Sequence, residues 1–366
     1  MAEIEKFMNI AVGDIEKIMN IEKGDIAKVM GVEIPAGTPL WQGTRGISMG
    51  RDNVSNYSQQ MLYRTISTSG SNAVDFGDLD AAEDGGYGST GRARGPGTAS
   101  SNNVYAVYWT GYETAASAFA NQAEVITIAT GADAIFGDDN HGFQAGTITR
   151  VQGAGICNGN QGHIAGGFRT GGYIATSYKI TVGTSGSATS SGDITSARSG
   201  PQGISHATYG YYCGGYEATG AVLNKIEKIT INSDSNAVDQ GDLTIGVAWG
   251  SASEDSSRGI MYSGYGDGGG KVDIGYFATA SGGDASDFGD KLLTHLYSGG
   301  VGNGIICEFW GGDDNAAGTD GWCHEIFYVT VQSLSDAQDT GAIVSWDTQS
   351  PAGTGGRYTT LASGVQ

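Results

Sequence analysis

Apolar and polar residues alternate in short runs that recur along most of the chain and end in Ser or Thr. The runs are rich in Ile, Val, Thr and Tyr, which favour strands, and the small polar residues after them favour turns. We expect each run to be one half-buried strand of a repeated unit. They are YRTIST (63–68), VITIAT (125–130), KITVGT (179–184), KITINS (228–233), YFATAS (276–281) and YVTVQS (328–333).

A Gly-Asp pair keeps the same phase as these runs. It begins at Gly77, Gly137, Gly192, Gly241 and Gly289, with a degenerate copy at Gly341, and an alanine precedes most of these glycines at a fixed distance. Each unit also has an earlier segment of small residues flanked by aromatic ones. Because glycine in a strand suits close approach of another backbone, we expect these segments to converge on a crowded axis. They are 104–112, 162–168, 210–216, 259–266 and 304–312.

Six units of about 50 residues, each with three or four strands, predict an all-β fold, a six-bladed β-propeller. An arginine, a strand ending in a glycine doublet, a variable loop and an aromatic or aliphatic strand follow one another in the units. This order resembles the kelch repeat, whose blades are four-stranded, over about nine tenths of the chain. The Trp found late in kelch repeats is absent, and Gly-Asp-Leu stands there instead. On this interpretation residues 210–243 form most of one blade.

The two ends of the propeller region look like parts of a single blade. Residues 350–365 resemble the opening of a blade, whereas residues 41–80 contain only later strands. Joined in space, they would complete the last blade and remove the exposed edges of an open ring. We therefore assign residues 37–366 to the propeller and residues 1–36 to a separate segment.

Residues 1–36 contain three 11-residue copies, IEKFMNIAVGD, IEKIMNIEKGD and IAKVMGVEIPA. Asp14 and Asp25 suit helix N-caps, so each copy predicts a short helix followed by an extended link. A right-handed coiled coil is the alternative, but it needs continuous helix through Gly13 and Gly24. So short a segment cannot bury its apolar residues alone, which predicts a docking role. These residues are Ile4, Phe7, Met8, Ile15, Ile18, Met19, Ile26, Val29 and Met30.

The charge of the chain narrows its partners. Asp and Glu number 39 against 19 Lys and Arg, a formal net charge of −20. Phosphate backbones and anionic membrane surfaces are normally bound by clustered basic residues, so we expect neither partner. No apolar run is long enough for membrane insertion, no signal peptide is recognisable, and four cysteines do not make a disulfide framework. These features indicate synthesis in the cytoplasm.

Few residues suggest chemistry. The five histidines lie in different units, and we interpret Cys157, Cys213 and Cys307 as buried small residues in similar places on the small-residue strand of three blades. The acidic glycine-rich segments 137–142, 264–271 and 310–321 offer oxygen ligands for Ca²⁺, but their Asp-Gly content is also typical of solvated turns. We expect no catalytic residue, metal site or cofactor.

The loops after the glycine doublets are better candidates for binding. They vary in length and combine aromatic rings with short polar residues, which suits contacts with a glycan or a protein. The kelch resemblance implies that they emerge together on one face of the propeller. The alternative is that about half of these rings pack between blades. The candidate residues are Trp109, Tyr112, Tyr216, Tyr265 and Trp310.

Acidic, glycine-rich chains with NAVDFGDL (72–79), GYYCGGY (210–216) and copies such as GDIEKIMNI (13–21) resemble virion structural proteins of tailed bacteriophages. This resemblance implies a non-enzymatic, homo-oligomeric virion protein that residues 1–36 attach to other virion proteins. The propeller would then be part of a tail fibre or tail-associated protein, with a face that contacts the host surface. The alternatives are a capsid or collar decoration, a cellular kelch-type scaffold and a propeller enzyme acting on sugars.

Overall fold

The structure is a computed structural model. The chain divides into two compact units, Met1–Thr38 and Pro39–Gln366, and every described residue belongs to the second. The predicted docking segment, with its apolar residues from Ile4 to Met30, lies outside the described residues. The residues described are 45–53, 56–69, 71–78, 99–101, 105–108, 112–113, 118–119, 124–128, 135–136, 150, 152–182, 188–255, 257–312, 325–342 and 359–364.

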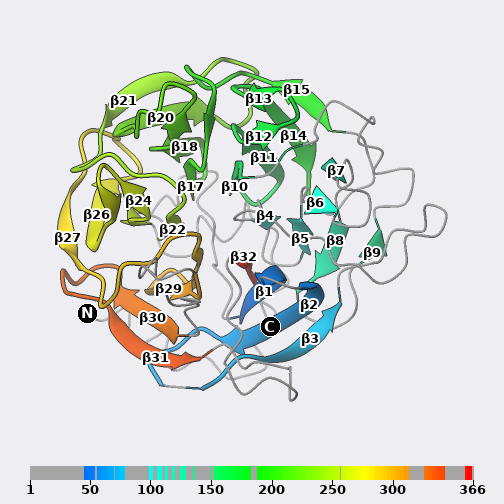
Figure 1. The fold of residues 1–366 in the computed structure, drawn as a ribbon, viewed down its shortest axis with the longest axis vertical. Coiled ribbons are helices and arrows are strands. Elements are labelled where there is room, and N and C mark those ends of the chain that lie inside the picture. The colour runs from blue at the N-terminus through cyan, green and yellow to red at the C-terminus, as the bar shows by residue number, and fades with distance from the viewer. Residues whose placement is uncertain are drawn as a thin grey trace, which may run out of the picture. The chain divides into compact units, whose positions relative to one another are not determined.

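Five antiparallel sheets of four strands are each formed by strands in chain order, and they are arranged around a common axis (Figure 1). Innermost strand first, they are β4 (Ala99–Ser101), β5 (Tyr105–Tyr108), β8 (Glu124–Thr127) and β9 (Ile135–Phe136); β10 (Ala154–Cys157), β11 (Gln161–Ala165), β14 (Ser177–Thr181) and β15 (Thr189–Ser191); β17 (Gln202–Ser205), β18 (Tyr209–Cys213), β20 (Lys225–Thr230) and β21 (Val238–Asp242); β22 (Ser251–Glu254), β23 (Arg258–Tyr262), β26 (Asp273–Ala278) and β27 (Ser286–Asp290); and β28 (Gly299–Gly302), β29 (Ile306–Trp310), β30 (Glu325–Thr330) and β31 (Gln338–Ala342).

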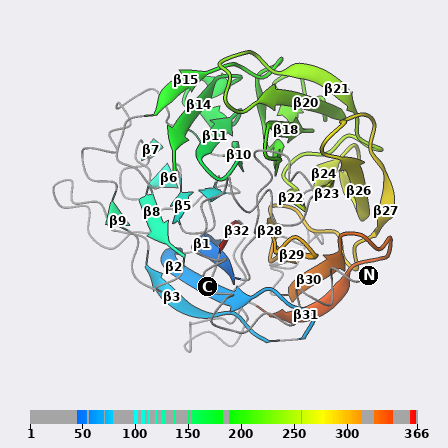
Figure 2. The same ribbon diagram turned by 180° about the vertical axis from the view of Figure 1, so that it is seen from behind.

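A further four-stranded sheet combines the two ends of this unit. β32 (Thr359–Gly364) pairs with β1 (Arg45–Asn53), which continues to β2 (Asn56–Thr65) and β3 (Val74–Asp78). The pairing is antiparallel and aligns Arg45 with Gly364. Figure 2 shows β32 beside β1 from the opposite side. The innermost strands β4, β10, β17, β22, β28 and β32 contact one another in a closed circle.

These sheets confirm the predicted all-β propeller. Residues 210–243 contribute β18, β20 and β21, three neighbouring strands of one blade. The runs that end in Ser or Thr overlap the third strand of each sheet, namely β2, β8, β14, β20, β26 and β30. Two-stranded hairpins such as β12 (Phe168–Arg169) with β13 (Gly172–Tyr173) and β24 (Tyr265–Gly266) with β25 (Gly269–Gly270) lie in the loops between second and third strands.

Two details of the sequence interpretation were wrong. The glycine-bearing aromatic segments contain the second strands, such as β18 and β23, rather than the strands at the axis. Closest approach at the axis involves other glycines, because a Cβ on Gly203 of β17 or on Gly300 of β28 would collide with a backbone oxygen of the adjacent blade. Cys157 also ends the innermost strand β10, whereas Cys213 and Cys307 lie on second strands.

The hydrophobic core lies between neighbouring blades. Tyr262 of β23 stacks on Phe309 of β29 with ring centroids 4.2 Å apart, and both residues belong to one buried cluster. Tyr211 of β18 meets Phe277 of β26 edge to face in the next cluster. Each blade therefore buries its apolar faces against its neighbours, so the packing of every blade depends on the blades beside it.

The Gly-Asp repeat joins the outer strands of consecutive blades. The backbone N–H of Asp242 donates to the Oδ1 atom of Asp284 at 3.0 Å, and the N–H of Ala285 donates to the carbonyl of Asp242 at 2.7 Å. We call this pair of bonds the outer staple. The alanine that keeps phase with the Gly-Asp pair is the residue whose backbone N–H makes the second of these bonds. Equivalent staples link Asp193 to Asn236 and Ala237, Asp290 to Asp336 and Ala337, and Ala342 to Asn72 and Ala73.

Glycine is required in the staple because the backbone of the next blade passes directly beside it. A Cβ on Gly241 would lie 2.5 Å from the backbone carbonyl carbon of Gly283, and a Cβ on Gly289 would lie 2.5 Å from the carbonyl oxygen of Ser335. The fourth strand also shifts register by a β-bulge before Gly241 and Gly289, which sets this edge against the neighbouring blade. The motif is therefore structural.

Gly241→Ala is expected to lower the free energy of unfolding by about 1–3 kcal/mol, because the added methyl must displace backbone. Gly275→Ala is the matched control, since its Cβ would first meet the movable Cε of Met261 at 3.3 Å. We expect a loss below about 1 kcal/mol there. Chemical denaturation of both variants measures the difference, and equal losses would show that the staple does not require glycine.

A second set of bonds links the blades through side chains of different kinds. In each case the acceptor is the carbonyl of the residue directly after a third strand, and the donor is a side chain of the preceding blade, on its second strand or, for Asn303, in the loop before it. Arg45 donates to Ile128, His163 to Ile231, Tyr211 to Thr279, Arg258 to Val331 and Asn303 to Ile66. The position is constant while the residue type varies, so the sequence repeat does not show it.

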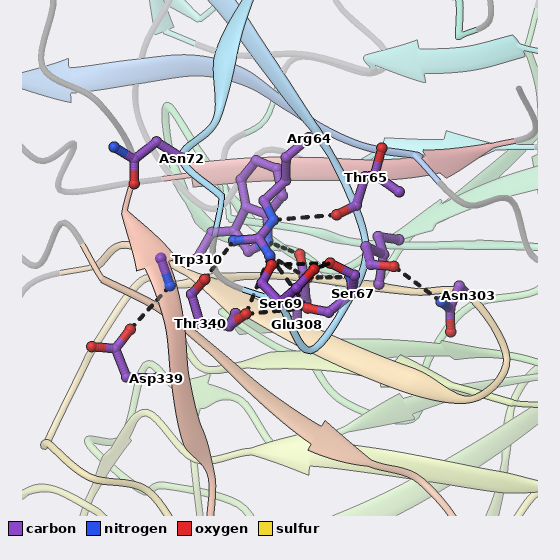
Figure 3. Close-up of polar contacts among 12 residues, drawn as sticks. Arg64, Thr65, Ser67, Ser69, Asn72, Asn303, Glu308, Trp310, Asp339 and Thr340 are labelled. Carbon is purple, nitrogen blue, oxygen red and sulfur yellow. Dashed lines mark hydrogen bonds and ion pairs between the residues drawn. The ribbon is translucent and has the colours of Figure 1, made fainter.

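The junction between the β28–β31 sheet and the β1–β3 sheet adds a buried ion pair (Figure 3). Arg64 of β2 lies 3.1 Å from Glu308 of β29, and both side chains are essentially inaccessible to solvent. The carboxylate of Glu308 also accepts bonds from the Ser67 N–H at 3.0 Å and the Trp310 indole at 2.9 Å. Burial raises the pKa of Glu308 to about 7, and these donors oppose that rise. Both oxygens of the Glu308 carboxyl group therefore have partners at this junction.

Arg64→Met is expected to cost about 3–5 kcal/mol of unfolding free energy, because it leaves the Glu308 carboxylate buried without its counter-ion. Lys179→Met is the control: it breaks the partly exposed pair of Lys179 with Asp234 and should cost at most about 1 kcal/mol. Denaturant titration compares the two. Similar small losses would mean that the Arg64–Glu308 pair does not secure this junction.

Candidate functional site

Each of the described segments that enter β10, β17, β22 and β28 places one residue in the left-handed backbone conformation. These residues are Gln152, Gly200, Trp249 and Tyr297, with φ between 53° and 64°. Their backbones form a chain: the N–H of Gly200 donates to the carbonyl of Gln152, that of Trp249 to Gly200, and that of Tyr297 to Trp249, at 2.6–2.9 Å. A continuous strip of backbone therefore crosses the four sheets that contain β10, β17, β22 and β28.

Glycine doublets attach the adjacent loops to this strip. The N–H of Gly215 donates to the carbonyl of Val247 at 2.7 Å, and the N–H of Gly167 donates to that of Arg198 at 2.8 Å. Both glycines of the 214–215 doublet have positive φ. A side chain on Gly214 would collide with the Val247 carbonyl in the segment that enters the next blade, and one on Gly215 would collide with the Arg198 side chain of its own blade. The doublet thereby sets Tyr216, the residue that follows it, against Trp249.

Six half-buried rings meet at this end of the sheets, and we call them the aromatic surface. They are Phe168, Tyr173, Tyr216, Trp249, Tyr265 and Tyr297. Tyr216 stacks on Trp249 with centroids 5.1 Å apart, and the other neighbouring rings of the series meet edge to face or tilted at 5.5–6.3 Å. Second-to-third-strand loops and the segments that enter innermost strands emerge at the same end, because successive strands are antiparallel.

Trp249 is fixed at the centre of the aromatic surface. Its indole N–H donates to the Oε1 atom of Gln152 at 3.0 Å, and the same oxygen accepts a bond from the Ser199 hydroxyl. The indole also lies over Gly200, where a Cβ would be 2.3 Å from its Cδ1 atom. Trp249 precedes β22, lies over Gly200 before β17, and binds Gln152 before β10, so its side chain spans three neighbouring blades. This arrangement makes a rigid contact surface with apolar ring atoms and polar hydroxyls.

The structure places the predicted binding residues as follows. Tyr216 and Tyr265 both belong to the aromatic surface. Trp310, in contrast, is fully buried at the Arg64–Glu308 junction, where its indole N–H donates a hydrogen bond to the carboxylate of Glu308. Trp109 lies outside the described residues, and only the backbone of Tyr112 is described, in strand β6 (Tyr112–Glu113).

Sequence reasoning missed Phe168, Tyr173, Trp249 and Tyr297. Trp249 and Tyr297 stand at the same distance after their Gly-Asp pairs as Gly200 does after Gly192. A large ring where another unit has glycine is therefore the signal that would have found them. Phe168 follows its glycine doublet directly, as Tyr216 does.

The buried cysteines are poor nucleophiles. Burial raises the pKa of Cys157 to about 12, and it raises the pKa of Cys213 and Cys307 further. All three are therefore neutral thiols near neutral pH, which agrees with the prediction that they are buried small residues. Within the described part of the chain, no group of three or more His, Cys, Asp or Glu residues is placed to hold a metal ion.

Of the acidic glycine-rich segments, 264–271 forms the β24–β25 hairpin, whereas 137–142 and most of 310–321 lie outside the described residues. No helix in the described residues is long and apolar enough to cross a membrane.

His163 is a buried residue of an interblade contact. Its Nε2 atom lies 2.9 Å from the carbonyl of Ile231, and its Nδ1 atom lies 3.3 Å from the Ser191 hydroxyl. A neutral ring that donates from Nε2 and accepts at Nδ1 satisfies both contacts. Burial lowers the pKa of His163 from 6.5 to about 4, outweighing the bond to Ile231, so the ring is neutral near neutral pH.

His163 should therefore make stability depend on pH. The unfolded state takes up a proton near pH 6.5 and the folded state only near pH 4, so unfolding free energy falls as pH drops through this window. The loss amounts to at most about 3 kcal/mol. His163→Gln should remove it, which paired denaturation curves at pH 7 and pH 4 would measure. His206→Gln, at a half-buried ring, should change the pH dependence less. An unchanged wild-type pH dependence in His163→Gln would contradict the assignment.

No protein-family model matches the chain, and comparison with curated proteins gives no match. The fold and the site together define the class: an all-β propeller with a rigid aromatic surface at one end of its sheets.

Proposed function

We propose that this protein is a non-enzymatic structural protein of a tailed-bacteriophage virion that displays a six-bladed, kelch-like propeller as a binding module. The observation that carries the binding role is the aromatic surface, six half-buried rings whose central member, Trp249, is bonded to Gln152 and stands on a backbone strip bonded from blade to blade. The virion assignment rests on the sequence resemblance. Residues 1–36 attach the chain to other virion proteins in a homo-oligomer, after synthesis in the host cytoplasm.

The closed circle of innermost strands supports six blades. β32 completes the β1–β3 sheet, and the outer staple of Ala342 with Asn72 and Ala73 joins this sheet to the β28–β31 sheet as the other staples join their blades. A ring closed in this way has no open blade edge in its interior. It is therefore a rigid platform for loops, which suits display outside a particle.

The buried charged groups support a structural role for the interior. Arg198 pairs with Glu227 at 3.0 Å within one blade, and Arg64 pairs with Glu308 between blades. Lys291 donates to the carbonyls of Ser263 and His295 and lies over the Tyr262 ring. Each of these groups is engaged in holding segments together, so a binding role at the surface is favoured over catalysis.

A tail fibre or another tail-associated protein is the favoured position, because a propeller with an aromatic face suits contact with the host surface. A capsid or collar decoration would use the same attachment without a receptor. A propeller enzyme acting on sugars would instead need polar or metal-binding residues converging at the centre of the ring.

Analysis of purified phage particles tests the virion assignment. We expect mass spectrometry to detect this chain at a fixed copy number, and cryo-electron microscopy to show residues 4–36 buried against another virion protein. A matched preparation from uninfected cells is the control. Absence of the chain from particles would contradict the assignment, and density without contact through residues 4–36 would contradict the attachment.

A further inference from the structure

We infer that the aromatic surface is a binding site for a neutral glycan, with Tyr216, Trp249 and Tyr265 at its centre. This inference deepens the binding role proposed above by naming the residues and the ligand class. The three rings lie within 5.1–6.3 Å of one another and are each half-buried. Their remaining exposed surface combines aromatic C–H and π groups with hydroxyls.

The hydroxyl groups provide the polar part of the site. In the part of the chain that the structure describes, the hydroxyls of Tyr173, Tyr216 and Tyr265 make no hydrogen bond to protein. Each can donate and accept, as sugar hydroxyls do, while the ring beside it covers the apolar C–H face of a pyranose. A ligand that alternates C–H and O–H groups matches this surface better than a purely apolar one.

Backbone strain provides an independent indication of function. Trp249 and Tyr297 have φ of 53° and 59°, a conformation that is uncommon for bulky residues. The equivalent position in the blade before that of Trp249 is occupied by a glycine, Gly200, which adopts the same conformation. Such strain of about 1–3 kcal/mol persists where surrounding structure enforces it, and it is concentrated at binding sites. Here the backbone chain from Gln152 to Tyr297 and the Gln152–Trp249 bond enforce it.

Charge decides between classes of glycan. The formal net charge is −20, so the protein as a whole repels sulfated, phosphorylated or sialylated chains. The described loops that carry the rings of the aromatic surface hold charges of both signs: Arg169 and Lys271 are found there with Glu217 and Asp267, and the ammonium group of Lys271 donates to the Asp267 carbonyl. No cluster of cations is present there among the described residues to bind an acidic sugar. A neutral glycan is therefore the ligand class that fits.

A rigid site has an energetic advantage for such a ligand. Sugar binding is weak for each group, so ordering flexible side chains would remove much of the gain. The interblade bonds fix Trp249 and Tyr216 before any ligand arrives. We therefore expect binding to be measurable with the isolated full chain.

The test is calorimetric titration of the full chain with neutral oligosaccharides of glucose, galactose, mannose and N-acetylglucosamine, with sialylated and phosphorylated oligosaccharides as the acidic set. We expect at least one neutral oligosaccharide to bind. Tyr216→Ala and Tyr265→Ala should each weaken that binding by up to about tenfold, from loss of the ring. Tyr265→Phe should weaken it less, because it removes only the hydroxyl.

Tyr209→Ala is the matched control, since Tyr209 is a half-buried ring at the opposite end of β18 from Tyr216. A second control separates protein docking from glycan binding. Leu292 and Leu293 are about half-exposed aliphatic residues in the segment between β27 and β28. Leu292→Ser with Leu293→Ser should leave glycan binding unchanged, whereas docking of a protein or of a second copy across this end would be weakened.

Several results would overturn the inference. They are failure of every neutral oligosaccharide to bind, binding of the acidic set only, and equal loss in Tyr209→Ala and Tyr216→Ala. Self-association detected by analytical ultracentrifugation and abolished by Tyr216→Ala would instead identify a second copy as the occupant. These outcomes are independent of the particle experiment, because a virion protein without glycan affinity would still be found in particles.

Discussion

The outer staple is the contact on which the rest of this propeller depends. Each four-stranded sheet buries its faces against its neighbours, so none has a complete core alone. The backbone of one blade passes so close to the Gly-Asp glycine of the preceding blade that no side chain fits. Two hydrogen bonds, from the Asp242 and Ala285 N–H groups in one example, then fix the register between the blades. The repeated Gly-Asp pair therefore sets the distance between neighbouring blades.

The same staple joins the β28–β31 sheet to the β1–β3 sheet, where the two partners are far apart in sequence. Ala342 bonds to Asn72 and Ala73 although they lie near opposite ends of the propeller sequence, so this contact closes a very long stretch of chain. The buried Arg64–Glu308 pair is found at this junction, with Trp310 and Ser67 completing the bonds to the carboxylate. Removing Arg64 would leave the Glu308 carboxylate buried without its counter-ion, which would destabilise this junction.

The aromatic surface is a consequence of the same ring. Because the blades are fixed relative to one another, backbones from neighbouring sheets approach closely enough for a bonded strip from Gln152 to Tyr297. That strip holds large residues in a strained conformation and lets Trp249 reach across a whole blade. A binding face formed by several blades is thus pre-organised by contacts that stabilise the fold.

The sequence alone determined the strands, their repeat and the propeller class, because alternation, turn residues and phase are local properties of the chain. It also pointed to Tyr216 and Tyr265 through their glycine-rich loops. Only the tertiary structure decided the partners: Trp310 lies in the core with Glu308, and Arg45, His163, Tyr211, Arg258 and Asn303 share one interblade role despite their different chemistry. Trp249 has a signal in the sequence, a large ring at the repeat position of Gly200, but its bond to Gln152 and its place over Gly200 came only from the tertiary structure. The physical reason is that these contacts join residues distant in sequence, whose approach is set by closure of the ring.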